Sequence, residues 1–208
     1  MNYVAQNTEG NETMRLITFA PTATTREVQN RCGHRLVVMM AAMAGISIAG
    51  GCNALNPPLD VVEKVDLGSY TGRWYEIARY PNSFERGCVG VTADYSLRQD
   101  GRINVLNTCR EGSLDGNVRT IEGIARVVDS STNAKLAVTF FGPFEGDYWI
   151  LELGNDYEYA VVGDPSRKFL WILSREPGLD DGLYHDILSR LPEKGFDPEN
   201  LEFVLQSE

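Results

Sequence analysis

Two histidines and four cysteines carry most of the reactive side chains of this 208-residue sequence. The histidines, His34 and His185, are too few for a multi-histidine metal site. The chain has no Gly-x-Ser-x-Gly, Cys-x-x-Cys or phosphate-loop motif. Asp180-Asp181, just before His185, fits the first turn of a helix. The residues predict no metal, no cofactor and no catalytic group. A lipid-modifying enzyme that uses His185 is the alternative.

The composition is that of a globular protein. Hydrophobic residues make up 43% of the chain and charged residues 23%. The formal net charge of −10 opposes a nucleic-acid site built from Lys and Arg. We therefore expect no nucleic-acid partner.

Residues 36–51 form an uncharged run that follows Arg31 and Arg35 and ends at Cys52. A basic stretch, a short apolar core and small residues at its end are typical of a secretory signal peptide. The run is shorter than the roughly 20 apolar residues of a transmembrane helix. The sequence therefore predicts a signal peptide, and a membrane-anchor helix is the alternative.

The end of this run, Ile-Ala-Gly-Gly-Cys at 48–52, resembles the lipobox of bacterial lipoproteins, although Ala49 stands where leucine is usual. The resemblance implies removal of residues 1–51, lipid attachment at Cys52 and, because Asn53 follows, sorting to the outer membrane. Two or more acyl chains would anchor the protein stably to a membrane. A chance cysteine is the alternative. Residues 52–65 are expected to form the lipidated tether.

The rest of the chain, 66–208, shows short apolar runs separated by turn residues. From Leu179 the apolar positions recur every four residues, which predicts one helix ended by Pro192 and Gly195. A last short strand is expected over Leu201–Gln206. The eight strands expected before the helix are Arg73–Tyr80, Val89–Leu97, Arg102–Cys109, Val118–Val128, Lys135–Phe141, Asp147–Leu153, Tyr157–Val162 and Lys168–Ser174.

Eight consecutive antiparallel strands form a sandwich or close into an up-and-down barrel. Closure removes exposed edges and leaves room for one small ligand. We therefore predict an all-β fold: an eight-stranded antiparallel β-barrel with the C-terminal α-helix packed outside.

Several motifs occur in an order that resembles a known family. Gly72-Arg73-Trp74 looks like the Gly-x-Trp signature that opens the first strand of lipocalins. It is joined by Phe84-Glu85-Arg86-Gly87, Tyr95-Ser96-Leu97, Asp100-Gly101, Phe140-Phe141-Gly142-Pro143-Phe144 and Leu170-Trp171-Ile172-Leu173-Ser174-Arg175. Over residues 66–206 the chain resembles the bacterial lipocalins, a lipoprotein branch related to apolipoprotein D and the plant temperature-induced lipocalins.

This resemblance implies a fatty acid or lysophospholipid ligand in the barrel, and a role in envelope lipid transport, storage or repair. It implies a lipid-anchored, periplasm-facing location at the outer membrane, and it leaves a homodimer open. Apolar side chains are expected to line the cavity. A structural envelope protein with a side-chain-filled barrel is the alternative. The candidates for lining or rimming are Tyr80, Phe84, Phe141, Trp149, Tyr159 and Trp171, each of which could equally be core.

Gly72, Trp74 and Arg175 are assigned to the closed end of the barrel. Trp74 is expected to plug that end, and Arg175 matches the family arginine that lies across this tryptophan. Strand alternation puts Glu76 on the same face as Trp74. An inward Glu76 needs a partner, for which Arg175 is our prediction. A bulge that turns Glu76 outward is the alternative.

Cys88 and Cys109 flank the second and third predicted strands. A simple hairpin leaves them two or three residues out of register, so a disulfide requires a bulge that shifts the pairing. Export permits oxidation. We predict a disulfide, with two buried thiols as the alternative.

Overall fold

The computed structural model describes residues 58–207. Contacts within the chain group these residues into one compact unit. The predicted N-terminal extension, the signal peptide, the lipidation site Cys52 and the first part of the tether lie outside the described residues.

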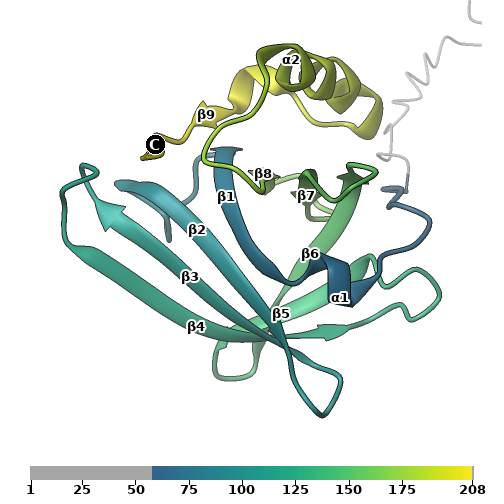
Figure 1. The fold of residues 1–208 in the computed structure, drawn as a ribbon. Coiled ribbons are helices and arrows are strands. Elements are labelled where there is room, and N and C mark those ends of the chain that lie inside the picture. Colours follow the sequence, from purple (N-terminus) through teal and green to yellow (C-terminus); the bar gives the residue numbers. More distant parts are fainter. Residues whose placement is uncertain (1–57, 208) are drawn as a thin grey trace, which may run out of the picture. The chain divides into compact units, whose positions relative to one another are not determined.

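Eight antiparallel strands close into a barrel, as predicted (Figure 1). Each strand pairs with its neighbours in sequence, and β1 pairs with both β8 and β2, which closes the sheet. The observed strands match the predicted ones to within a few residues at each end. They are β1 (Gly72–Arg79), β2 (Cys88–Leu97), β3 (Ile103–Glu111), β4 (Val118–Val127), β5 (Lys135–Phe141), β6 (Phe144–Leu153), β7 (Tyr159–Gly163) and β8 (Leu170–Ser174).

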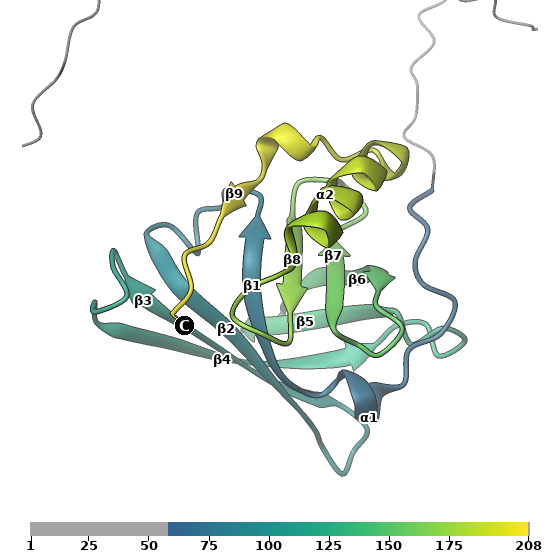
Figure 2. The ribbon, with the colours of Figure 1, turned by 45° about the horizontal axis from the view of Figure 1, so that its top comes forward.

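A single longer helix, α2 (Asp181–Arg190), packs outside the barrel over β7 and β8 (Figure 2). Asp180 caps its N-terminus by accepting a hydrogen bond from the Leu183 amide at 3.0 Å. Ile187 is fully buried against Val161 and Ile172 of the wall. This confirms the prediction of an amphipathic helix on the outer wall. Shorter helical segments are α1 (Leu67–Tyr70), η1 (Leu191–Lys194) and η2 (Pro198–Asn200).

The barrel wall separates two apolar clusters. One fills the interior and includes Trp74, Val105 and Ile150. The other lies between the wall and α2 and includes Ile77 and Leu170. Because successive side chains of a strand point to opposite faces, these clusters show which face each residue occupies.

The C-terminal tail seals the seam between β1 and β2. The two strands pair only as far as Tyr75, beyond which they separate. The short strand β9 (Glu202–Phe203) pairs with β1 in this gap, where the Val204 amide donates to the Ile77 carbonyl at 2.8 Å. On the other side, the Gly90 amide of β2 donates to the Leu205 carbonyl at 2.7 Å. The predicted final strand therefore exists, and it bridges two strands of the barrel.

Candidate functional site

Trp74 fills one end of the barrel, which we call the closed end. Its ring is fully buried, and its Nε1 donates to the Tyr70 carbonyl of α1 at 2.9 Å. The guanidinium carbon of Arg175 lies 3.8 Å from the centroid of the indole ring. Such a stacked cation contributes about 0.5–2 kcal/mol. The predicted pairing of Trp74 with Arg175 is thus present as a contact.

Arg175 also holds the backbone of this end together. Its Nη1 donates to the Arg73 carbonyl at 2.8 Å and its Nη2 to the Ser69 carbonyl at 2.7 Å. Gly72 has φ +95°, and a Cβ added there would lie 3.3 Å from Nη1 of Arg175. Glycine is therefore favoured at 72 both by backbone conformation and by the close approach of Arg175.

Three tyrosines sit above Trp74 in the interior. The Tyr148 hydroxyl lies 2.8 Å from that of Tyr70 and 3.1 Å from that of Tyr95. Burial raises the pKa of each of the three hydroxyls, so all stay protonated at neutral pH. The interior next to Trp74 is therefore occupied by side chains.

Glu76 faces the interior, as one of the two alternatives predicts, but its partner is Arg79 and the predicted pairing with Arg175 is wrong. Arg79 Nη1 donates to Glu76 Oε1 at 2.9 Å, and both side chains are buried. The register of β1 against β8 shifts between Glu76 and Ala78. Ile77 and Ala78 both face the helix, so Arg79 returns to the interior.

The environment of Glu76 disfavours its charge. Burial raises the pKa of this carboxyl well above its usual value, and the nearby Glu85 carboxylate raises it further. Arg79 acts in the opposite direction, and it also pairs with Glu202 of β9 at 2.7 Å. A buried ion pair thus links β1 to the C-terminal tail.

The loops 80–87, 112–117, 142–143 and 164–169 lie at the end of the barrel opposite Trp74, which we call the loop end. Phe84, on the first of these loops, is exposed and packs against Phe169 with ring centroids 5.7 Å apart. Trp171 of β8 stacks on Phe169 and donates from Nε1 to Glu85 at 3.2 Å. Phe141 and Phe144 are exposed on either side of the β5–β6 turn.

Three of the six predicted lining aromatics lie on the outer wall, which corrects their assignment. Tyr80 packs on Phe196 and donates to the Asp197 carbonyl at 2.8 Å. Tyr159 packs in the cluster under α2. Trp149 contacts that cluster, and the Lys135 ammonium nitrogen lies 4.3 Å from the centroid of its ring. Its neighbours in β6, Tyr148 and Ile150, occupy the interior, so residue 149 points outward.

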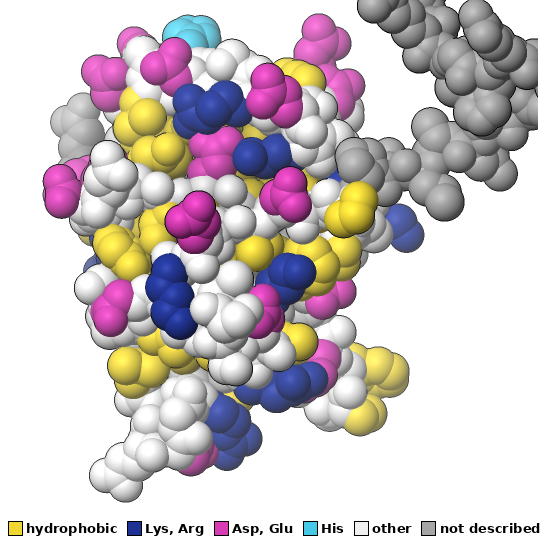
Figure 3. Space-filling model, turned by 90° about the vertical axis from the view of Figure 1, so that its right-hand side faces the viewer, with side chains coloured by type: hydrophobic (Ala, Val, Ile, Leu, Met, Phe, Trp, Pro, Cys, Tyr) yellow, Lys and Arg dark blue, Asp and Glu magenta, His cyan; other side chains and the backbone are white. Residues whose placement is uncertain are grey.

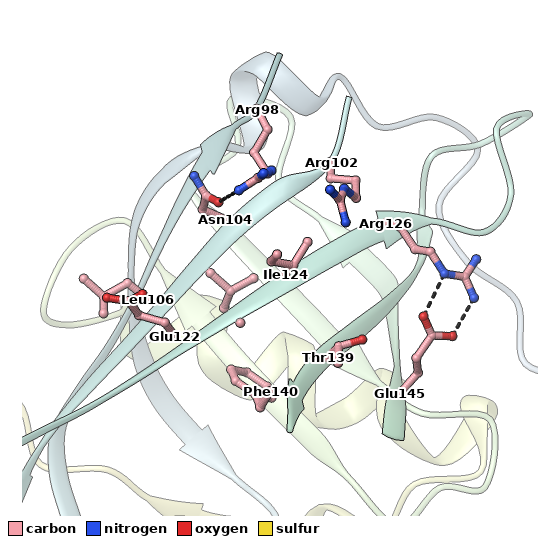
Figure 4. Close-up of a pocket in the computed structure, with 12 residues that line it drawn as sticks. Arg98, Arg102, Asn104, Leu106, Glu122, Ile124, Arg126, Thr139, Phe140 and Glu145 are labelled. Atoms are coloured by element: carbon pink, nitrogen blue, oxygen red, sulfur yellow. Dashed lines mark hydrogen bonds and ion pairs between the residues drawn. The ribbon is translucent and has the colours of Figure 1, made fainter. Parts of the chain in front are cut away.

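A hollow of about 720 Å³ lies where β4 and β5 separate (Figure 4). Pairing of these strands stops at Ile124 and Thr139, so the two strands part toward the loop end. Leu106, Ile124 and Phe140 are among the residues that line it (Figure 4). At its edge Arg126 pairs with Glu145 at 2.6 Å. This hollow was not predicted, because no sequence pattern shows where two paired strands part.

Asn107 and Arg119 also lie on the inner side of the wall and were missed. Asn107 continues the alternation of Ile103 and Val105 in β3, and its register partner is Ile121. Arg119 lies opposite Cys109, the next inward residue of β3. The alternation of β3 was visible in the sequence and would have found Asn107.

Cys88 and Cys109 form the predicted disulfide, with their Cα atoms 5.4 Å apart. The register of β2 against β3 shifts between Val89 and Thr92. This is the bulge that the sequence argument required. The disulfide packs against Val91 and Val204, beside the seam sealed by the tail.

Replacing both cysteines by alanine in Cys88→Ala/Cys109→Ala is expected to lower the free energy of unfolding by about 3 kcal/mol. The cross-link spans 21 residues of sequence, and a loop of that size has this effect in the chain-entropy description. Urea denaturation measures the loss, and reduction of the parent protein should reproduce it. Full alkylation of both thiols in the non-reduced protein would contradict the disulfide.

His185 is exposed on α2. On the face drawn in Figure 3, acidic and basic side chains are interspersed and a histidine lies at the upper edge. The His185 ring lies beside that of Tyr184, also on the helix, with ring centroids 6.4 Å apart. Over residues 58–207, no three His, Cys, Asp or Glu side chains are placed to hold a metal ion. Among the helices of that same range, none has the length and apolar character needed to cross a membrane.

A closed eight-stranded barrel with one end filled has the architecture of proteins that hold one small ligand. The family model for the lipocalin-like domain matches residues 65–206. The chain belongs to the lipocalin family, which confirms the resemblance seen in the sequence.

Curated relatives include both bacterial and eukaryotic proteins. The outer membrane lipoprotein Blc of Escherichia coli K12 is 40% identical over 174 residues, covering 83% of this chain and 98% of the relative. Temperature-induced lipocalin-1 of Arabidopsis thaliana is 38% identical, covering 72% and 84%. Apolipoprotein D of Mus musculus is 37% identical, covering 80% and 92%. Insecticyanin of Manduca sexta shares the fold, with a TM-score of 0.60 at 23% identity, covering 73% and 86%.

Proposed function

We propose that this protein is an outer-membrane lipocalin that binds a fatty acid or lysophospholipid at the loop end of its barrel. The difference between the two ends carries the proposal. The closed end is filled by Trp74 and the tyrosines, whereas the loop end exposes Phe84, Phe141 and Phe144. Apolar side chains that stay exposed favour an apolar ligand or surface. Phe84 and Trp171 are the predicted lining aromatics that remain candidates for ligand contact, and Phe141 is a candidate for the rim.

The proposed location rests on the relatives and on the N-terminal sequence. Relatives named outer membrane lipoproteins align with 83% of this chain. The predicted acylation site Cys52 precedes the first described residue, Pro58, by six positions. Six residues reach at most about 20 Å. An anchored barrel would therefore stay close to the membrane surface, in our proposal the periplasmic face of the outer membrane.

A membrane-tethered barrel suits lipid transport, storage or repair, because a poorly soluble ligand then travels only a short distance. The proposal includes no cofactor, no metal and no nucleic-acid partner. Membrane attachment is tested by Cys52→Ser in the full chain, which should abolish incorporation of a labelled palmitate. Unchanged labelling would contradict acylation at this cysteine.

Ligand binding is tested by native mass spectrometry on residues 53–208, which include all of the described barrel, after export to a bacterial periplasm and purification without detergent. We expect a bound mass of a fatty acid or lysophospholipid that is released on denaturation. An empty barrel that also takes up no added lipid would favour the structural alternative. The same spectrum gives the oligomeric state and so tests for a homodimer.

A further inference from the structure

Arg119 and Asn107 are neighbours on the inner face of the wall, near the loop end. The register pairs Asn107 of β3 with Ile121 of β4, and Cys109 with Arg119. Arg119 and Asn107 are therefore diagonal neighbours across the strand pair. Such residues lie about 7–8 Å apart on the same face, within reach of long side chains. One ligand group can contact both.

Arg119 is a cation without an acidic partner. Its Nη2 donates to the Phe84 carbonyl at 3.2 Å and to Cys88 Sγ at 2.8 Å, and sulfur is a weak acceptor. None of the ion pairs within residues 58–207 involves Arg119. Arg79 reaches the Cys88 carbonyl at 3.2 Å but is already paired with Glu76 and Glu202. Arg119 is thus a guanidinium at the loop end that has, among the described residues, only neutral hydrogen-bond partners and no carboxylate to balance its charge.

Asn107 offers an unpaired polar group beside it. Its Oδ1 is buried and has no hydrogen-bond partner in the described part of the chain. The oxygen and nitrogen of an asparagine amide can exchange places by a rotation of the side chain. Buried polar groups are almost always paired. An unpaired amide inside a binding barrel therefore indicates a place for a polar group of the ligand.

The wall beyond these two residues is apolar. Ile121 lies opposite Asn107, and the next inward pair is Val105 with Gly123. The Phe140 ring covers Gly123 so closely that an added Cβ would lie 2.7 Å from it. A polar pair near the loop end thus gives way to an apolar surface deeper in the barrel. An acidic headgroup on an apolar chain has the same two-part character.

We propose that Arg119 and Asn107 bind the acidic headgroup of the lipid, a fatty-acid carboxylate or a lysophospholipid phosphate, while its chain lies against Ile121 and Phe140. This inference rests on the proposed function and adds a rule of selectivity: the barrel prefers an acid to its neutral ester. The planar guanidinium suits both kinds of oxyanion, because it donates two parallel hydrogen bonds.

The test is displacement of the neutral fluorescent probe N-phenyl-1-naphthylamine from the protein. The competitors are oleate, methyl oleate and 1-oleoyl-lysophosphatidate, each below its micelle-forming concentration. For the parent protein we expect at least one acid to bind about tenfold more tightly than the ester. The comparison of oleate with lysophosphatidate tells a carboxylate ligand from a phosphate ligand.

In Arg119→Gln the acid should bind about tenfold more weakly and the ester unchanged. Arg119→Lys should keep a preference for the acid. Asn107→Leu should weaken acid binding while the melting temperature holds or rises, because an unpaired buried amide is replaced by an apolar group of similar size. Arg110→Gln is the matched control, since Arg110 is an exposed arginine of β3 whose Nη1 contacts the Gly116 carbonyl at 3.4 Å.

Equal affinity of the parent for oleate, lysophosphatidate and the ester would overturn the selectivity rule and leave lipid binding intact. Equal weakening of acid and ester in Arg119→Gln would overturn the assignment to Arg119. If neither the probe nor any of the lipids binds, the proposed function fails as well, which native mass spectrometry records independently.

Discussion

Trp74→Ala is expected to lower the free energy of unfolding by about 3–5 kcal/mol, the usual loss for a buried tryptophan. The indole is fully buried at the closed end and contacts the Tyr70 ring at a centroid distance of 5.1 Å. Its removal also leaves the Tyr70 carbonyl without the Nε1 donor and Arg175 without the ring beneath its guanidinium. Urea denaturation followed by far-ultraviolet circular dichroism measures the loss.

Trp149→Ala is the matched control for this prediction. Trp149 is half-buried on the outer wall, so its truncation should cost about 1 kcal/mol. Equal losses of unfolding free energy in the two variants would show that Trp74 at the closed end stabilises the protein no more than a tryptophan on the outer wall. An unchanged denaturation midpoint in Trp74→Ala would show that the ring does not plug the barrel.

Much of the fold was predictable because it depends on local patterns. Apolar alternation and turn residues located the eight strands, and a four-residue repeat located α2. The contact of Trp74 with Arg175 was predicted from the resemblance to lipocalins, whose family arginine lies across this tryptophan. A bulge or a one-residue shift does not hide these sequence patterns, because each depends on residue type and approximate spacing.

The sequence did not show which face of the sheet each side chain occupies. One extra residue in a strand moves every following side chain of that strand to the opposite face. The shift between Glu76 and Ala78 sends Tyr80 to the outer wall and brings Arg79 inside to Glu76. Trp149 and Tyr159 were misassigned for a related reason: alternation gives two faces but does not say which is inner. The seam sealed by the tail depends on contacts between distant segments, which no local pattern contains.

Three groups of polar and aromatic side chains occupy the interior. Trp74 and the three tyrosines fill the closed end, and burial keeps the tyrosine hydroxyls neutral. The second group is the ion pair of Glu76 with Arg79, which ties β1 to β9 through Glu202. The third group is Asn107 with Arg119. Within the described range, Arg79 is paired with carboxylates and Arg119 is not, which explains why the two arginines are assigned different roles.

Arg79→Met is expected to destabilise the protein by about 3–5 kcal/mol at neutral pH, because it leaves a buried carboxylate without its cation. Arg79 and Glu76 are both buried, and Glu85 adds a second acid nearby. In Glu76→Gln/Arg79→Met the loss should be smaller, since the charge at residue 76 is removed together with its partner. Urea denaturation of the parent, both single variants and the double variant completes the thermodynamic cycle.

The effect of Arg79→Met should also depend on pH. The pKa of Glu76 is raised in the folded protein, so between its unfolded and folded pKa values the folded state binds the extra proton. Stability from this group is then present at low pH and is lost as the pH rises through the folded pKa. Removing the Arg79 cation raises that pKa further, so the loss caused by Arg79→Met should shrink as the pH is lowered from 7 and Glu76 takes up a proton. The double variant lacks this titration and serves as the control.

Two outcomes would show that Glu76 does not depend on Arg79 for its charge. One is a loss of stability in Arg79→Met that stays constant over this pH range, and the other is an equal loss in Arg79→Met and the double variant.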